Sequence, residues 1–395
     1  MKSTSCKIIA EQVLEQCLAG NLPKQIPSAL LQDAGGPALF GIVVEGLADR
    51  FEPSLCDIYA RLFSKAVARV MGADPGMMVA RYERVRRTRP IAGKPHRIFV
   101  LSRVTLGADV AVTSVLMAAA KRRFPHAEIV FVGPRKNYEL FAGDKRIHHA
   151  EVVYRRGGLR ERLAVAGELQ AVLAPEDSVV IDPDSRITQL GLVPVFPEER
   201  YHLFESRAYG GDSDRPLPEL AAAWAAETLG SAGAKPYISL GEQPRRAAYV
   251  AVSLGVGENP AKRLADPFEE ELLKLLGAQG VHVCIDKGAG GEEAERVAGA
   301  VERSGVRATL WEGSFAGFAA IIAGSRLYVG YDSAGQHVAA ACGVPLVSVF
   351  AGFPVPRMFQ RWRPVGEHCR AIQVDRPDVP EVLEKVREAI SGAGV

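Results

Sequence analysis

The chain has 395 residues, 48% of them hydrophobic, and a formal net charge of only +2. This length predicts two or three domains with substantial cores, and a charge so close to balance argues against nucleic acid as a partner. The six cysteines lie far apart and form no CxxC pair, which is typical of reduced thiols in a cytosolic protein and indicates no zinc site.

The N-terminal twenty residues do not resemble a secretory signal, because Glu11 and Glu15 interrupt their apolar pattern. No apolar run in the sequence reaches the length needed to cross a bilayer. Both observations predict a soluble, cytoplasmic protein.

Residues 1–95 predict several short helices and a basic linker. Apolar side chains repeat at helical spacing, and Pro23, Pro27 and the Gly-Gly-Pro turn at 35–37 interrupt them. The helices suit contact with a partner or an acceptor, or equally a structural cap on the next domain. The run 81–97 holds six arginines and one lysine. It is interpreted either as a peripheral contact with the inner face of a membrane or as a solvated helix end and linker.

At Arg97 the pattern changes to alternating strands and helices. Such alternation predicts a doubly wound parallel sheet with helices on both faces, here in a domain of residues 96–235. Residues 231–246 contain glycine, two prolines and few large apolar side chains, and they predict the connection to a second domain. The predicted strands are 97–102, 128–133, 151–154, 178–182 and 201–206, and the predicted helices are about 110–124, 159–173 and 217–229.

The second domain, residues 236–395, repeats this alternation. Ligands of open α/β sheets bind beyond the carboxyl ends of the strands, so the loops there are the expected place for a site. The predicted strands are 247–255, 281–286, 307–311, 327–329 and 344–350, and the predicted helices are about 267–276, 292–303, 315–323, 334–342 and 379–390.

The stretch 327–352 combines a buried strand, a turn, a short helix and a second buried strand. Asp332 and Ser333 lie where the first strand becomes the helix, and Ala334 and Gly335 follow. Small residues there allow a ligand to approach the backbone, and a helix N-terminus offers free N–H groups and partial positive charge. This arrangement suits a phosphate or diphosphate. The alternative is that Asp332 or Ser333 merely caps the helix.

The same stretch, DSAGQHVAAACGVP, resembles the C-terminal signature of glycosyltransferase family 9, the heptosyltransferase-like glycosyltransferases. That signature commonly reads Asp-Ser/Thr-Gly-x-x-His-Leu-x-Ala-Ala-x-Gly-x-Pro, and Ala334 stands here where glycine is expected. The resemblance covers roughly residues 97–375. It implies the GT-B architecture, in which two doubly wound Rossmann-like domains face a cleft, here with an N-terminal helical appendage. The residues in register are Asp332, Ser333, His337, Ala340, Ala341, Gly343 and Pro345.

The resemblance also implies roles for these residues. Asp332, Ser333, Ala334, Gly335 and His337 would contact the nucleotide-sugar donor. The histidine lies about one helical turn after Ser333, so it could point at the same ligand, although a lone helix histidine is usually packed or on the surface.

The N-terminal signature of the family is similar to the strand, loop and helix that begin at Arg97. In the family an aspartate after glycine is thought to deprotonate the acceptor hydroxyl, and Asp109 is the matching residue. Ala108 separates it from Gly107, which departs from the family pattern by one residue. An inverting transfer needs such a base on the face opposite the leaving nucleoside diphosphate. The alternative is that Asp109 is a helix N-cap.

The loop 253–263 follows the first strand of the second domain. Lys262 and Arg263 resemble the Lys-Arg pair of the family, in which Lys262 would neutralise charge on the leaving diphosphate while Arg263 assists or pairs elsewhere. Ser253 and Gly257 are further candidate phosphate contacts, although the G-x-G at 255–257 is a weak signal by itself. The alternative is a solvent-facing basic pair.

Two further loops carry candidates. Glu312 is expected near the nucleoside, where it would accept from a ribose hydroxyl, unless this loop serves only to cap the next helix. The first-domain run Asp182-Pro183-Asp184-Ser185-Arg186 is expected on the acceptor side through Asp182, Asp184 and Arg186. It looks like a DxD metal motif, but its proline and its place in the first domain argue against a metal.

The sequence therefore predicts an inverting, metal-independent glycosyltransferase that needs no cofactor. It would move a sugar from a nucleoside-diphosphate donor, of which ADP-heptose is an example, to a hydroxyl acceptor on a glycan or lipid. One alternative is a nucleotide-sugar epimerase or hydrolase, which would need further cleft carboxylates such as Asp182 and Asp184. The other is a non-catalytic sugar-nucleotide-binding protein in which the altered loops have lost the chemistry.

Overall fold

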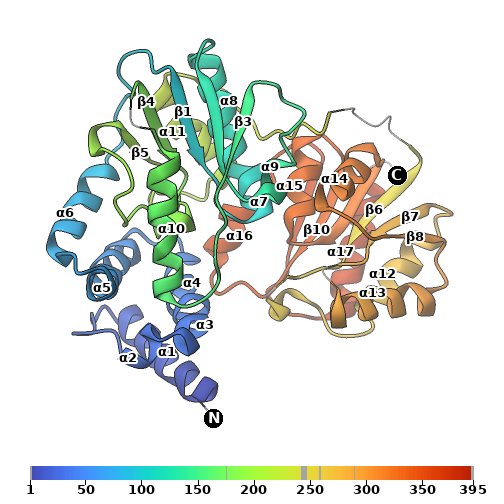
Figure 1. Ribbon diagram of the computed structural model, residues 1–395. Helices are drawn as coiled ribbons and strands as arrows, with labels where there is room; N and C mark the ends of the chain where they lie inside the picture. The colour runs from blue at the N-terminus through green and yellow to red at the C-terminus, as the bar shows by residue number, and fades with distance from the viewer. Residues whose placement is uncertain (1, 175, 242–246, 258, 289, 393–395) are drawn as a thin grey trace. The chain divides into compact units, whose positions relative to one another are not determined.

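The structure is a computed structural model that describes residues 2–174, 176–241, 247–257, 259–288 and 290–392. It divides into two compact units, each with its own parallel sheet (Figure 1). Residues 242–246 of the predicted linker and Glu258 of the predicted phosphate loop lie outside the described residues. The N-terminal unit comprises Met1–Val104, Val115–Tyr138 and Arg146–Ala234, and the C-terminal unit comprises Thr105–Ser114, Glu139–Lys145 and Lys235–Val395.

The N-terminal unit contains a five-stranded sheet in the order β3-β2-β1-β4-β5, and all its pairings are parallel. Its central strands are rich in Val and Ile and are buried on both faces, as helices on both sides require. This strand order is that of a doubly wound fold. The strands are β1 (Arg97–Leu101), β2 (Glu128–Gly133), β3 (Ile147–Glu151), β4 (Ser178–Asp182) and β5 (Tyr201–Leu203).

The helices of this region agree with the sequence in most places. The helix predicted at 217–229 has those bounds, whereas the one predicted from 110 begins earlier, at Leu106. The α-helices before β1 are α1 (Lys2–Leu18), α2 (Ser28–Leu31), α3 (Gly36–Ala38), α4 (Glu45–Ala48), α5 (Pro53–Met71) and α6 (Pro75–Val85), with a π-helical segment at Leu39–Val44. After β1 come α7 (Leu106–Ala108), the π-helical turn Asp109–Thr113, α8 (Ser114–Arg123), α9 (Arg135–Tyr138), α10 (Leu159–Val172) and α11 (Leu217–Leu229).

The strand predicted at 151–154 is wrong, because β3 lies at Ile147–Glu151. Ile147 pairs with Ile129 and is buried, whereas Val153, which attracted the prediction, is 55% exposed. His148 and His149 stand in the middle of the true strand and hid its apolar pattern.

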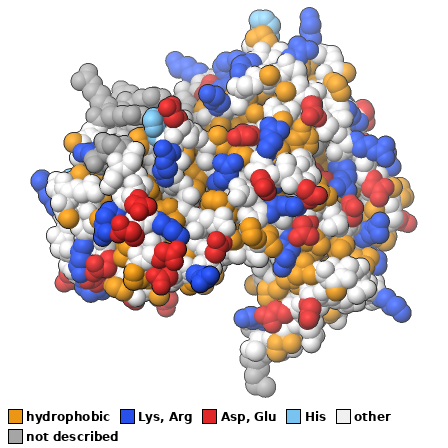
Figure 2. Space-filling view, turned by 180° about the vertical axis from the view of Figure 1, so that it is seen from behind, with side chains coloured by type: hydrophobic (Ala, Val, Ile, Leu, Met, Phe, Trp, Pro, Cys, Tyr) orange, Lys and Arg blue, Asp and Glu red, His pale blue; other side chains and the backbone are white. Residues whose placement is uncertain are grey.

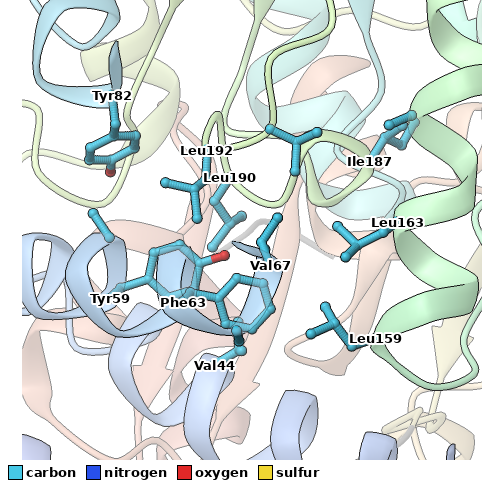
Figure 3. Packing of buried hydrophobic residues seen from close by; sticks show 14 of the residues in the cluster. Val44, Tyr59, Phe63, Val67, Tyr82, Leu159, Leu163, Ile187, Leu190 and Leu192 are labelled. Carbon is cyan, nitrogen blue, oxygen red and sulfur yellow. The ribbon is translucent and has the colours of Figure 1, made fainter. Parts of the chain in front are cut away.

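The N-terminal helices and the first sheet share one hydrophobic cluster. Figure 3 shows Tyr59 and Phe63 of α5 beside Leu190 and Leu192, which follow β4, with Leu163 of α10 across from them. The two aromatic rings stack with centroids 5.1 Å apart. Burying each such side chain stabilises the fold by about 1.5–3 kcal/mol. Residues 1–95 thus pack into the core of the first sheet, while the domain boundaries near 95 and 235 stay a prediction.

Several basic side chains of the run 81–97 have partners within the N-terminal unit. The helix α6 ends at Val85, and the residues from 86 to 96 are neither helix nor strand and are largely exposed, as a solvated helix end and linker requires. On the face drawn in Figure 2, basic side chains alternate with acidic and apolar ones and gather into no large single patch. The occupied members are Arg81 (to Gly191 O, 3.0 Å), Arg84 (to Glu198, 2.6 Å), Arg86 (to Glu205, 2.8 Å), Arg89 (to Tyr201 O, 3.0 Å) and Arg97 (to Glu128, 2.5 Å). Within the described ranges, no helix is both long and apolar enough to span a membrane.

The C-terminal unit contains a six-stranded parallel sheet in the order β11-β10-β9-β6-β7-β8. Its core lies between the central strands and helices α12 and α17. The sequence missed α16 and β11. The strands are β6 (Tyr249–Ser253), β7 (His282–Asp286), β8 (Ala308–Trp311), β9 (Leu327–Tyr331), β10 (Leu346–Phe350) and β11 (Cys369–Gln373). The helices are α12 (Phe268–Gly277), α13 (Gly291–Ser304), α14 (Phe315–Gly324), α15 (Ala334–Ala341), α16 (Pro356–Trp362) and α17 (Val379–Gly392).

Candidate functional site

An ion pair lies at the carboxyl end of β9, where the chain turns into α15. Lys262 Nζ donates to Asp332 Oδ2 at 2.6 Å and to the backbone oxygen of Asp332 at 3.3 Å. The side chain of Lys262 is 20% exposed and that of Asp332 is 8% exposed. Lys262 is thus the more accessible partner, and its flexible side chain can turn from Asp332 to another anion.

The backbone around Lys262 is held by its neighbours. Asn259 caps the short 3-10 turn Pro260–Lys262 by accepting from the backbone N–H of Ala261 at 3.1 Å. Gly352, which follows β10 with φ +67°, lies directly against this turn. A Cβ at Gly352 would stand 2.3 Å from Ala261 O and 2.8 Å from Lys262 N. Glycine is therefore required there for Lys262 to reach Asp332.

Two buried polar side chains, missed by the sequence analysis, hold the other side of Asp332. Gln336 donates from its amide nitrogen to Asp332 Oδ1, and Ser348 Oγ donates to Gln336 Oε1 at 2.5 Å. Both are fully buried, and burying a polar group is costly unless it is hydrogen-bonded. We call Lys262, Asp332, Gln336 and Ser348 the Lys262 cluster. The signal that could have revealed them is a Gln and a Ser inside otherwise apolar stretches.

His337 adjoins this cluster. Its ring is 5% exposed and contacts Trp362 with centroids 5.9 Å apart. Burial lowers the pKa of His337 to about 4, against the attraction of Asp332 and with the help of Lys262. The imidazole is therefore neutral at pH 7, and it can offer a hydrogen bond to a ligand but no charge.

The start of α15 is shaped for close approach. Ser333 is the N-cap by position but makes no capping hydrogen bond, and the carboxylate of Asp332 binds Lys262 and Gln336 instead. The interpretation of either residue as a capping side chain is therefore wrong. Tyr328 OH lies 3.1 Å from Ser333 Oγ, and a Cβ at Gly335 would stand 2.3 Å from that hydroxyl. The phenol thus requires glycine at 335, one position after the family's usual place.

The segment Thr105–Ser114 belongs to the C-terminal unit, where α7 and the turn Asp109–Thr113 contact α15. A Cβ at Gly107 would stand 3.1 Å from both Ala334 Cα and His337 Cδ2, so glycine lets α7 lie on the start of α15. Asp109 is fully buried and accepts from Thr113 Oγ1 at 2.6 Å. Its backbone N–H donates to Thr105 O at 3.0 Å. Asp109 is therefore inside the helix, and its interpretation as an N-cap is wrong.

The other predicted donor residues differ in their surroundings. Arg263 pairs with Asp266 and with Glu269 Oε1 at 3.3 Å, so it pairs elsewhere, one of the two outcomes expected for it. Ser253 is buried at the end of β6, and Gly257 is exposed with φ +60°. Glu312 is 65% exposed and forms an ion pair with Lys287.

The run 182–186 lies in the N-terminal unit, where its two aspartates are buried. We call Asp182, Asp184, Tyr201 and Arg207 the Arg207 cluster. Asp184 accepts from Arg207 at 2.9 and 3.1 Å, and Asp182 accepts from Tyr201 OH, from Ser185 N at 2.6 Å and from Thr188 Oγ1 at 2.5 Å. Burial raises the pKa of Asp182, although these hydrogen bonds oppose the shift.

Arg186, the more accessible member of the run, pairs with Glu45 at 2.5 Å. Acceptor contact by this run stays a prediction. In the parts of the chain that the structure describes, no three His, Cys, Asp or Glu side chains group so as to hold a metal ion.

Comparison with known proteins adds to this geometry. Residues 219–389 match the model of glycosyltransferase family 9 (heptosyltransferase). The chain carries a family 9 glycosyltransferase domain. All the strands of the second sheet and the whole Lys262 cluster lie between residues 219 and 389, so the matched range contains the candidate site. The predicted resemblance to the heptosyltransferase-like glycosyltransferases is thereby confirmed.

Solved structures of this family share the fold. Escherichia coli heptosyltransferase WaaC with ADP aligns at a TM-score of 0.56 and 19% identity, over 74% of this chain and 99% of that one. E. coli ADP-heptose LPS heptosyltransferase II gives 0.53 and 19%, over 75% and 98%. A family 9 glycosyltransferase from Veillonella parvula gives 0.54 and 17%, over 76% and 91%. No curated protein matches the chain in sequence. The predicted fold class, with two doubly wound parallel sheets as in these structures, is confirmed.

Proposed function

We propose that this glycosyltransferase transfers a heptose from ADP-heptose to a hydroxyl group of a glycan or lipid, with inversion at the anomeric carbon and without a metal ion. The observation that carries the proposal is the Lys262–Asp332 pair beside the start of α15, where no side chain caps the helix. Structures of E. coli WaaC with ADP and with ADP-2-deoxy-2-fluoro heptose, which share the fold, support the choice of donor.

The donor diphosphate would bind between Lys262 and the first N–H groups of α15. Lys262 would turn from Asp332 to the phosphate oxygens, and Ser333, Ala334 and Gly335 would supply backbone N–H groups at the positive end of the helix dipole. Neutral His337 would add a hydrogen bond without adding charge. These groups stabilise the negative charge that grows on the departing ADP, which is where electrostatic catalysis acts.

Asp109 would act as the general base. It takes the proton of the acceptor hydroxyl while that oxygen bonds to the anomeric carbon and the bond from that carbon to the diphosphate oxygen breaks. The π-helical turn that begins at Asp109 supports this role, because such turns occur frequently at functional sites. Proton, sugar and ADP are then all accounted for without a covalent enzyme intermediate.

The remaining assignments follow from the contacts. Ser253 and Gly257 are proposed to line the phosphate site, and Glu312 to reach the ribose after leaving Lys287. Arg263 is proposed to anchor the lysine loop through Glu269. Arg186 is proposed on the acceptor side, and the acceptor is proposed to be met at the inner face of a membrane. The carboxylates that an epimerase would need, Asp182 and Asp184, already accept hydrogen bonds from their own unit.

Calorimetric titration with ADP, GDP, UDP, CDP and dTDP, without added metal, tests this proposal first. We expect ADP to bind and the other four to bind at least about tenfold more weakly, and we expect Lys262→Ala to weaken the binding of ADP. Turnover of ADP-heptose with release of ADP would then establish the donor. If none of the five nucleotides binds, the proposed donor site is wrong.

A further inference from the structure

Gln336 and Ser348 connect α15 to the middle of β10 beneath the candidate phosphate site. Gln336 is fully buried although it lies in the first two turns of α15, and Ser348 is fully buried in a strand that is otherwise apolar. Neither side chain reaches the surface, and both form hydrogen bonds within the C-terminal unit. Ser348 contacts Gln336, and Gln336 contacts Asp332 and lies 3.4 Å from His337 Nε2.

The direction of these hydrogen bonds fixes the orientation of the Gln336 amide. Ser348 has a single hydroxyl proton, which it donates to Gln336 Oε1 at 2.5 Å. The amide oxygen is thereby turned toward β10, and the NH₂ group is turned toward Asp332 Oδ1. A reversed amide would set its oxygen against the carboxylate and leave the serine without an acceptor.

Asp332 therefore has two donors of different kinds, a mobile cation and a fixed neutral amide. Lys262 is the donor that a phosphate would draw away, because a diphosphate competes with the carboxylate for the same ammonium group. A buried carboxylate that loses its cation is strongly destabilised unless other donors remain. Gln336 is the donor that stays.

We propose that Gln336, oriented by Ser348, is a positioning residue that holds the Asp332 carboxylate in place when Lys262 turns to the donor diphosphate. The inference rests on the proposed function, since it assumes that a diphosphate binds beside Lys262. It assigns Gln336 a role in ligand exchange at this site that goes beyond packing. Without Gln336, the buried carboxylate loses both donors when Lys262 leaves, and binding of the diphosphate becomes weaker.

The test is calorimetry with ADP as the probe, on the full chain, as a double-mutant cycle. The four proteins are the wild type, Gln336→Leu, Asp332→Asn and the double variant Asp332→Asn, Gln336→Leu. We expect Gln336→Leu to raise the ADP dissociation constant by about tenfold or more when Asp332 is present, and by less than about threefold in the Asp332→Asn background, where no carboxylate has to be held. A loss of packing alone would give the same factor in both backgrounds.

Two further variants sharpen the result. Ser348→Ala keeps the amide but loses its orientation, and it should raise the ADP dissociation constant by a smaller factor, again only when Asp332 is present, even if Gln336→Leu does not fold. Gln279→Leu, which replaces an exposed glutamine just after α12, should leave the ADP affinity unchanged.

The outcomes separate this inference from the proposed function. If the wild type does not bind ADP, both are overturned. If the wild type binds ADP, and Gln336→Leu and Ser348→Ala each change the dissociation constant by the same factor with Asp332 present as in the Asp332→Asn background, the positioning role is overturned and the proposed function stands.

Discussion

The Lys262 cluster and the Arg207 cluster both place aspartates at the carboxyl end of a buried parallel strand, yet they differ in how those aspartates are held. Asp184 faces an arginine that is 4% exposed and binds it through two hydrogen bonds. Asp332 faces a lysine that is 20% exposed and binds it through a single ammonium group. A planar guanidinium locked between partners cannot turn to a ligand, whereas an ammonium on a flexible stem can.

The backbone beside the Arg207 cluster is also held in place. Asp184 has φ +69°, and Gln189 and Leu190 later in that loop have φ +51° and +59°, conformations that residues other than glycine rarely adopt. The N-terminal helices hold this loop, since Tyr59 OH donates to Gln189 O at 3.0 Å and Arg81 donates to Gly191 O at 3.0 Å. We infer that the Arg207 cluster stabilises the fold and that the Lys262 cluster exchanges partners.

The largest expected effect concerns Asp109, which begins the π-helical turn that contacts α15. Asp109→Asn keeps the shape of the side chain and removes the proposed base, so kcat for transfer from ADP-heptose should fall by about 10²–10⁴. The ADP dissociation constant should stay within about threefold of wild type, since the base does not bind the diphosphate. Thr113→Val, which removes only the hydrogen bond to Asp109, should reduce kcat far less. Undiminished turnover by Asp109→Asn would remove this residue from the mechanism.

A matching change in the Arg207 cluster should act on stability instead. Arg207→Met leaves Asp184 buried without its cation and should lower the free energy of unfolding by about 3–5 kcal/mol, measured by urea denaturation. The protein that remains folded should bind ADP as the wild type does. Arg155→Met is the control, because it breaks an ion pair to Glu168 in which both side chains are 44% exposed, worth at most about 1 kcal/mol. A fully stable Arg207→Met protein would break the comparison between the two clusters.

Removal of the mobile cation should weaken the ligand and spare the fold. Lys262→Ala should raise the ADP dissociation constant by about 10- to 150-fold, which corresponds to the 1.5–3 kcal/mol of a charge-assisted hydrogen bond. Lys274→Ala is the matched control, since that lysine pairs with Glu270 and Glu271 on the exposed face of α12. Equal ADP affinity in the two variants would place the phosphate elsewhere.

The sequence predicted the elements of the C-terminal unit well because their signals are local. The strands 327–329 and 344–350 are apolar runs bounded by glycine and proline, and the structure has strands in both places. By contrast, β11 reads Cys-Arg-Ala-Ile-Gln and lies at the edge of the sheet, where its side chains are only partly buried. It therefore has no apolar run, and the sequence analysis missed it.

Individual site residues could be named from the sequence, but their partners could not. The family pattern singles out Asp332 and Lys262, yet the two lie 70 positions apart and nothing in the sequence indicates that they form an ion pair. For the same reason, Asp184 resembles part of a site until Arg207, which comes after the next strand, is seen to bind it. Gln336 occupies a position that the family pattern leaves open, so its role emerges only with Ser348 beside it.

The smallest expected effect compares one histidine from each unit. Burial lowers the pKa of His202, on β5, and that of His337, on α15, to about 4. In the unfolded chain a histidine binds a proton near pH 6.5, so as the pH falls from 7 to 5 the unfolded state gains protons and the folded state does not. Stability is therefore lost over this range, by about 2 kcal/mol for each histidine.

Urea denaturation at pH 7 and pH 5 measures this loss in the wild type, His202→Gln and His337→Gln. Every other titrating group is common to the three proteins, so the difference in pH dependence reports the single histidine replaced. Each variant should lose about 2 kcal/mol less than the wild type on acidification. A reduced loss for His202→Gln alone would mean that His337 binds a proton in the folded protein. The Lys262 cluster would then already be open to water before any donor arrives.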